Sequence, residues 1–209
     1  MQPSNLLILL SDQHRRDAMS ALGHPAAHTP TLDGLAKRGV RFDAAYCNSP
    51  ICVPARASIA TGNYVHRHRH WDNATPYDGT QPAWGHRLQA AGRRVVSIGK
   101  LHYRSEQDPT GFDEQIIPYH VKDGVGDAQG LLRQDLLPMH LLRRFVMEAG
   151  PGESWVTEYD REVAKRACSW LLEEAPRHND VPWVLFVSFI CPHPQFQCPP
   201  SFFNAVDPD

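Results

Sequence analysis

Cys52 and Arg56 are the residues whose types and spacing most directly suggest chemistry. Pro54 near the start and Gly62 after the end predict a helix over residues 54–61, which puts Cys52 at a helix N-terminus. The helix dipole, together with the Arg56 guanidinium one turn later on the same face, would stabilise a thiolate at Cys52. The pattern permits a reactive cysteine, and a small buried cysteine without a chemical role remains the alternative.

Polar side chains follow three apolar segments that have the character of buried strands. The segments and the polar residues after them are 6–10 with Asp12 and Gln13, 94–98 with Lys100 and His102, and 183–190 with His193. In α/β proteins, the loops at the carboxyl ends of such strands bind ligands. These polar residues are therefore candidates for a ligand site.

The remaining pattern supplies helices between these segments. Amphipathic periodicity, capping residues and terminal glycines predict helices over 31–39, 54–61, 84–91 and 157–174, a strand over 40–46, and one or two helices within 131–147. The repeated order strand, polar loop, helix predicts an α/β fold with a mostly parallel sheet, helices on both faces and right-handed crossovers. No linker or internal repeat divides the sequence, so we expect residues 1–209 to belong to a single domain.

Bulk properties argue against several classes of partner. The chain has 209 residues, 42% of them hydrophobic, which is enough for a buried core. A net charge of −2, with acidic and basic residues interleaved, gives no broad cationic face, so we expect neither nucleic acid nor membrane partners. Residues 6–10 are too few to span a bilayer and no secretory signal accompanies them, so we expect a cytoplasmic protein with its five cysteines reduced.

The segment from Cys52 to Gly62, Cys-Val-Pro-Ala-Arg-Ala-Ser-Ile-Ala-Thr-Gly, resembles the modification motif of type I sulfatases. In that family the cysteine is converted to formylglycine, and an oxygen of its hydrated form attacks sulfur. The second hydroxyl then lets the intermediate collapse and expel sulfate. The resemblance implies this fate for Cys52, with Arg56 holding the diol and a formylglycine-generating enzyme as the maturation partner.

The same resemblance implies a divalent metal, with Ca²⁺ expected and Mg²⁺ or Mn²⁺ as alternatives. Asp12 matches a family metal ligand after the first strand, and residue 52 also binds the metal in the family. Many sulfatases have a second aspartate where this chain has Gln13, whereas choline sulfatases and phosphonate monoester hydrolases share the Asp-Gln form. Gln13 would present an amide oxygen to a less anionic site.

Three further segments resemble family substrate contacts. Lys100 and His102 match a Gly-Lys-x-His segment in which the lysine contacts sulfate and the histidine contacts the diol; as alternate residues of an extended segment they would point the same way. Asn73 matches a choline sulfatase asparagine beside the ester, and His193 matches a histidine that contacts sulfate or protonates the leaving oxygen. Surface residues, a turn-forming asparagine and a structural loop histidine are the alternatives.

The resemblance covers most of residues 4–113 and then 158–196, and it implies an alkaline phosphatase-like sulfatase fold that is incomplete in this chain. Residues 114–154 match no family segment, so we expect a family-variable insertion of the kind that lines the leaving-group pocket. Two downstream metal ligands of the family have no counterpart here. We therefore expect an N-terminal fragment that binds the metal weakly or not at all, with inactivity of the truncated chain as an open expectation.

The preferred function is hydrolysis of a small-molecule sulfate ester. One alternative keeps the machinery but assigns phosphonate or phosphate mono- or diesters, and another is a noncatalytic fragment whose Cys52 stays a thiol. A choline substrate would need an aromatic cage, for which the candidates are Trp71, Tyr77, Trp84 and Tyr103. Residues 66–70, His-Arg-His-Arg-His, fit either a solvated loop or an anion site, and a homo-oligomer is an open expectation.

Overall fold

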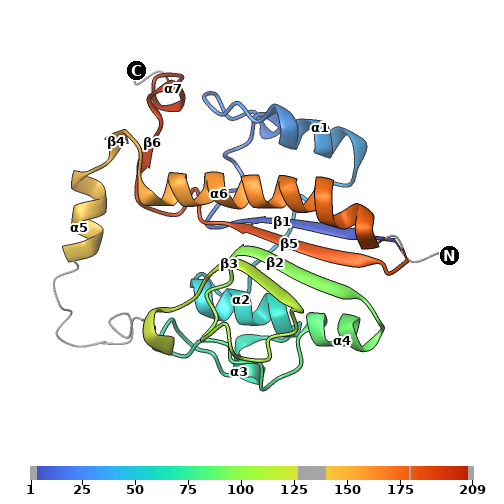
Figure 1. Ribbon diagram of the computed structural model, residues 1–209. Coiled ribbons are helices and arrows are strands. Elements are labelled where there is room, and N and C mark those ends of the chain that lie inside the picture. Colours follow the sequence, from blue (N-terminus) through green and yellow to red (C-terminus); the bar gives the residue numbers. More distant parts are fainter. Residues whose placement is uncertain (1–3, 127–139, 179, 207–209) are drawn as a thin grey trace. The chain divides into compact units, whose positions relative to one another are not determined.

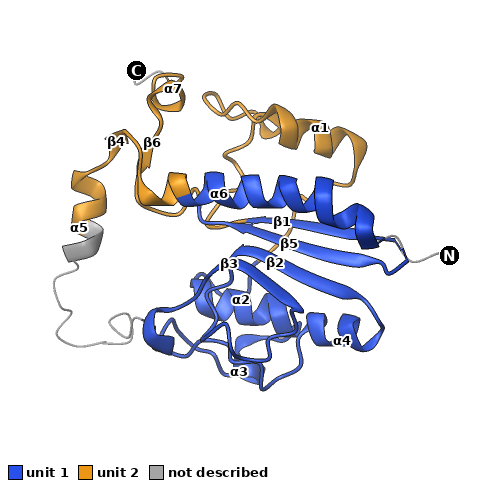
Figure 2. Ribbon diagram, in the orientation of Figure 1, with its two compact units in different colours: residues 1–10, 47–138, 159–190 blue, residues 11–46, 139–158, 191–209 orange. Residues whose placement is uncertain are grey.

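The computed structural model describes residues 4–126, 140–178 and 180–206, which form two compact units (Figures 1 and 2). Unit 1 consists of Met1–Leu10, Cys47–Pro138 and Tyr159–Ile190. Unit 2 consists of Ser11–Tyr46, Met139–Glu158 and Cys191–Asp209. Because the stretches of the two units alternate along the sequence, they are not consecutive domains.

Unit 1 is built on a four-stranded sheet with the order β1-β5-β2-β3, in which β5, β2 and β3 are parallel. Its strands are β1 (Leu6–Ser11, whose last residue belongs to unit 2), β2 (Arg94–Lys100), β3 (Glu114–Tyr119) and β5 (Trp183–Phe189). Its helices are α2 (Cys52–Thr61), α3 (Val65–His68), α4 (Trp84–Ala90), η2 (Lys122–Gly124), most of α6 (Trp155–Ser169), η4 (Trp170–Glu174) and η5 (Ala175–His178).

Each face of this sheet carries its own hydrophobic core, because side chains alternate between the two faces of a strand. Leu185 and Val187 of β5 pack with Val163 and Trp170 on one face, where α6 lies. Phe186 joins the core on the other face, which includes residues of α2 and adjoins Trp84 of α4. The predicted α/β fold, with a mainly parallel sheet and helices on both faces, is confirmed (Figure 1).

A β-bulge interrupts the β2–β3 pairing at the carboxyl ends of both strands. Gly99 lies on β2 at this point with φ 97, and a Cβ there would meet the Ser188 carbonyl oxygen at 2.2 Å. Only glycine fits that approach. On β3, Ile117 has φ 43, a left-handed conformation that a β-branched residue rarely adopts. Such strain persists only where the surrounding structure holds it.

Unit 2 consists of short elements around two small tertiary contacts. They are η1 (Ser20–Leu22), α1 (Pro30–Arg38), α5 (His140–Met147), β4 (Gly150–Pro151), β6 (Gln197–Cys198), α7 (Pro200–Phe203) and the start of α6. Asp33 of α1 accepts hydrogen bonds from the Ser20 hydroxyl (2.7 Å) and the Ala21 amide (3.0 Å), which fixes η1 against α1. Strands β4 and β6 pair in parallel.

The structure corrects some predicted elements. Residues 40–46 form no strand, although their composition is typical of one. Val40, Phe42 and Tyr46 are exposed, so this segment lacks the packing that would stabilise a strand. The helix predicted over 157–174 starts at Trp155, and its last residues form the π-helical η4. Within 131–147, α5 covers the end and residues 127–139 lie outside the described part.

The segment predicted as an insertion, 114–154, begins with a strand of the main sheet, β3. Its variability among relatives stays a prediction, as does the single domain. The five cysteines, all within the described ranges, are not joined in disulfides. Across the described ranges, every helix is too short or too polar to traverse a bilayer.

Candidate active site

The N-terminus of α2 places Cys52 as the first helical residue, with a partly exposed side chain. Ile51 precedes it in an extended conformation and offers no capping side chain, so the amides of the first turn need other acceptors. The Val53 amide donates to Asn73 Oδ1 at 3.0 Å. Asn73 therefore lies at the helix end that carries Cys52.

Arg56 connects α2 to the carboxyl ends of two strands. Its side chain is buried, with 5% of the residue exposed, and its guanidinium Nη1 donates to the Lys100 carbonyl and to Ser188 Oγ (3.1 Å). Ser188 is fully buried on β5 and was missed by sequence reasoning. Its signal was a hydroxyl near the end of the otherwise apolar run 183–189.

Lys100 is the last residue of β2, and His102 lies two residues further along the chain. The backbone between them is not extended. His102 has φ 58, so the prediction that strand alternation aims both side chains is wrong. Both instead contact Tyr119 of β3. The His102 ring stacks on the Tyr119 ring with centroids 5.8 Å apart, and the Lys100 ammonium lies 5.9 Å from the same ring centroid.

Tyr119 belongs to the site and was not predicted, because its segment matched no known pattern. It is half-buried, and its carbonyl accepts the His102 amide at 2.7 Å. Burial, followed by the charge of a nearby Cys52 thiolate, raises the pKa of the Tyr119 phenol. The Tyr119 phenol therefore stays neutral in the ordinary pH range, and it lies close enough to Cys52 for a charge there to affect its pKa.

A hydrogen-bond chain fixes the segment that precedes Cys52. His68 Nδ1 accepts the His70 amide (3.1 Å), so neutral His68 carries its proton on Nε2 and donates it to Ser58 Oγ (2.8 Å). Ser58 in turn donates to Asn48 Oδ1 at 2.9 Å. Burial, with 2% of His68 exposed, lowers the pKa of this imidazole and favours the neutral form. Within 66–70, His68 is therefore a structural residue.

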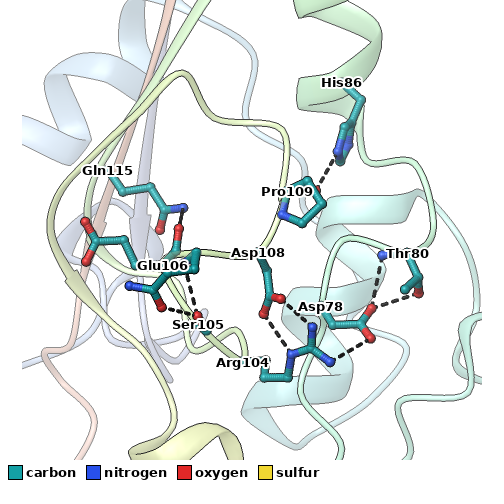
Figure 3. A network of polar contacts seen from close by, with 10 residues as sticks. Asp78, Thr80, His86, Arg104, Ser105, Glu106, Asp108, Pro109 and Gln115 are labelled. Atoms are coloured by element: carbon teal, nitrogen blue, oxygen red, sulfur yellow. Dashed lines mark hydrogen bonds and ion pairs between the residues drawn. The ribbon is translucent and has the colours of Figure 1, made fainter.

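A second network joins the segment after Asn73 to the segment after His102 (Figure 3). The Arg104 guanidinium pairs with Asp108 and, at 3.3 Å, with Asp78, while the Arg104 amide donates to the Tyr77 carbonyl at 2.9 Å. These links restrain the chain segments that directly follow Asn73 and His102.

Asp12, Gln13 and His193 lie in unit 2, whereas the other predicted site residues lie in unit 1. Asp12 is partly buried just after β1, and Gln13 is exposed with φ 62. His193 donates from Nδ1 to the Pro194 carbonyl at 2.9 Å. Within the described ranges, no group of three or more His, Cys, Asp or Glu side chains is placed to hold a metal ion.

Three of the four candidates for an aromatic cage lie in a hydrophobic core or pack against it. Tyr77 and Tyr103 are buried in the core beneath α2, with ring centroids 5.0 Å apart, and Trp84 packs against the same core. Burial raises the pKa of Tyr77 to about 12. Only Trp71, of these four, is exposed, at 56%. Aromatic residues spaced along a sequence do not reveal which of them fill a core.

The sulfatase family model matches residues 4–208. The choline-sulfatase of Rhizobium meliloti is 31% identical over 209 residues, covering 97% of this chain and 41% of that protein. The crystal structure of the phosphonate monoester hydrolase of Agrobacterium radiobacter is similar with a TM-score of 0.67 and 25% identity, covering 97% of this chain and 44% of that one.

A structure solved in complex with its substrate D-glucosamine-2-N,6-O-disulfate is also similar, with a TM-score of 0.66, 26% identity and coverage of 92% of this chain and 35% of that one. The chain thus spans less than half the length of each of these proteins.

Proposed function

Because the chain belongs to the sulfatase family, we propose that it carries the nucleophile of a sulfuric ester hydrolase, formed from Cys52. The observation that carries this proposal is the hydrogen bond from Arg56 to the Lys100 carbonyl. It joins the helix that starts at Cys52 to the strand end that bears Lys100 and His102. One helix terminus and one strand end thereby meet, and each brings a cationic side chain.

The electrostatics of this arrangement suit an anionic ester. Lys100 is 2% exposed and Arg56 is 5% exposed, so both positive charges are held where water screens them little. Fixed charges of this kind stabilise the negative charge that develops on ester oxygens in the transition state. A neutral substrate would gain nothing from two buried cations.

A formylglycine at residue 52, when formed, would supply an oxygen nucleophile in its hydrated state. In this proposal Arg56 orients that residue, His102 accepts a proton from it, and Lys100 binds an ester oxygen. Asn73 fixes the helix start through the Val53 amide. Asp12 and Gln13 are proposed metal ligands and His193 a proposed ester contact.

Phosphonate or phosphate ester hydrolysis is the second candidate. Asp12 is followed by Gln13 rather than by a second aspartate, and the chain shares its fold and 25% of its residues with the Agrobacterium radiobacter phosphonate monoester hydrolase. A phosphonate monoester and a phosphate diester each carry one negative charge, as a sulfate monoester does, so Lys100 and Arg56 would face a similar anion in either reaction. The same residues would serve either reaction.

The test compares rates on an aryl sulfate and an aryl phosphonate monoester, using the complete protein matured with a formylglycine-generating enzyme. We expect faster turnover of the sulfate, and loss of both activities in Cys52→Ala. A higher kcat/KM for the phosphonate would assign the second function. Turnover of either ester by Cys52→Ala at the wild-type rate would contradict a nucleophile at residue 52.

Several expectations stay proposals. They are the maturation enzyme as a partner, a small-molecule sulfate ester as substrate, Ca²⁺ with Mg²⁺ or Mn²⁺ as alternatives, a cytoplasmic location, no nucleic acid or membrane partner, and a homo-oligomer. The Rhizobium meliloti relative is a choline-sulfatase, which makes choline sulfate a reasonable first substrate to assay. The cage that would recognise it is not supplied by Tyr77, Trp84 or Tyr103.

A further inference from the structure

The bulge in β3 determines which side chain stands opposite Lys100. Beyond Ile98, two residues of β2 face three residues of β3, so Lys100 pairs with Tyr119. Without the extra residue, Pro118 would occupy this register position. The bulge includes the strained Ile117, and bulges commonly redirect a side chain near a functional site. The backbone strain at Ile117 is therefore associated with the register that places Tyr119 opposite Lys100.

Tyr119 contacts both predicted substrate-facing residues. Its carbonyl accepts the His102 amide at 2.7 Å and the Leu101 amide at 3.2 Å, which fixes the left-handed turn at His102. Its ring stacks on the His102 imidazole at an interplanar angle of 24°. The Lys100 ammonium lies within 6 Å of the ring centroid, inside the range of a cation–π attraction.

The ring is itself held from the side of α6. Tyr159 packs edge-on against Tyr119 with centroids 6.1 Å apart, and its hydroxyl donates to the Ile117 carbonyl at 2.7 Å. One residue of α6 thus supports both the ring and the bulge that places it. Tyr119 has restricted freedom even though it is partly exposed.

We propose that Tyr119 is a positioning residue, whose ring holds the Lys100 ammonium and the His102 imidazole in the orientation that an anionic ester requires. The proposal rests on the proposed function for the identity of the ester. Lysine has a flexible stem, so loss of the ring would let its ammonium adopt other rotamers. Misplaced groups that act in the transition state lower kcat more than they raise KM.

The experiment compares Tyr119→Phe, which keeps the ring, with Tyr119→Leu, which removes it. In the complete matured enzyme acting on an aryl sulfate, we expect kcat of Tyr119→Phe within about threefold of wild type and kcat of Tyr119→Leu lower by about tenfold or more. KM should change less than kcat. Tyr119→Met makes the same comparison if the leucine variant does not fold.

A second readout does not depend on hydrolysis. The NMR signal of the His102 ring Cε1–H, assigned by its loss in His102→Asn, should move when the ring current of Tyr119 is removed. Tyr64→Leu is the matched control, because exposed Tyr64 stacks on His66 at 5.9 Å outside the site. That variant should move the His66 signal and leave the His102 signal and kcat unchanged.

Wild-type kcat in Tyr119→Leu would overturn the proposal. So would a Tyr119→Phe variant as impaired as Tyr119→Leu, since the hydroxyl would then be the important group. If the wild-type protein hydrolyses no ester, the proposed function fails and the NMR readout decides alone. An unmoved His102 signal in Tyr119→Leu would then refute the ring contact, and a moved signal would support it.

Discussion

At the scale of single residues, two buried serines of neighbouring strands have opposite surroundings. Ser188 Oγ accepts a hydrogen bond from the Arg56 guanidinium, whereas Ser97 Oγ finds no hydrogen-bond partner in the part of the chain that the structure describes. Both are essentially fully buried. A buried hydroxyl stabilises a protein only when it is hydrogen-bonded, so equal substitutions at these positions should have unequal effects.

Ser188→Ala should lower the free energy of unfolding by about 1–3 kcal/mol, because the buried guanidinium loses an acceptor. Ser97→Ala should be neutral or slightly stabilising, because it removes a hydroxyl that pays a desolvation cost without a hydrogen bond. Urea unfolding of the two variants checks the difference. Equal losses of stability would show that Ser188 is not an anchor of Arg56.

Five of the residues predicted from the sequence lie near one another in unit 1, whereas two residues that contact them were not predicted. Cys52, Arg56, Asn73, Lys100 and His102 are found where α2 meets the strand ends of unit 1. Ser188 and Tyr119 were overlooked. The Ser188 hydroxyl stands out in an apolar run but does not reveal its partner, and Tyr119 lies in a segment that matched no known pattern. Their roles follow from pairing between distant segments, which spacing along the chain does not encode.

At the scale of elements, the end of β2 depends on Gly99. Its φ of 97 and the 2.2 Å approach of a hypothetical Cβ to the Ser188 carbonyl leave no room for a side chain. Gly62, which ends α2, offers a comparison: its φ is 68, but a Cβ there would have no neighbour within 4 Å. An alanine at residue 62 would therefore introduce backbone strain alone, whereas an alanine at residue 99 would introduce backbone strain and a steric clash.

Gly99→Ala should lower the free energy of unfolding by more than roughly 3 kcal/mol, because β2 and β5 must separate in addition to the backbone strain. Gly62→Ala should cost only about 1–2 kcal/mol, the penalty of a left-handed alanine. Thermal or urea unfolding measures both. A Gly99→Ala protein as stable as Gly62→Ala would mean that the strand ends do not approach as described.

Strands and helices with strong periodicity were predicted well, since β1, β2, β5, α1, α2 and α4 lie within a few residues of their expected bounds. The exception, residues 40–46, had strand composition but no pairing partner. β3 and its bulge were not predicted, although β3 does have a pairing partner, β2. Its register depends on β2, and hydrophobic pattern alone does not report an inserted residue.

At the scale of the whole molecule, a buried histidine and a partly buried one should couple stability to pH. Burial lowers the pKa of His68 and of His120 below the ordinary value of 6.5. The unfolded chain then takes up protons at a higher pH than the folded one, so protonation favours unfolding. The free energy of unfolding should be constant above about pH 6.5 with respect to these groups and should decrease as the pH falls below it.

Urea unfolding between about pH 8 and pH 5 measures this dependence, because that interval brackets the ordinary pKa of histidine. His68→Gln should show a shallower decrease than wild type, whatever its absolute stability. An unchanged slope in His68→Gln would show that His68 is not held neutral by the fold.

The chemical state of residue 52 decides the central claim, because every other proposed role depends on it. The measurement is mass spectrometry of the peptide that contains residue 52, from protein produced with and without a formylglycine-generating enzyme. We predict that the aldehyde replaces the thiol in the first sample and that ester hydrolysis rises with the converted fraction. A thiol at residue 52 in both samples, with or without hydrolysis, would contradict the account.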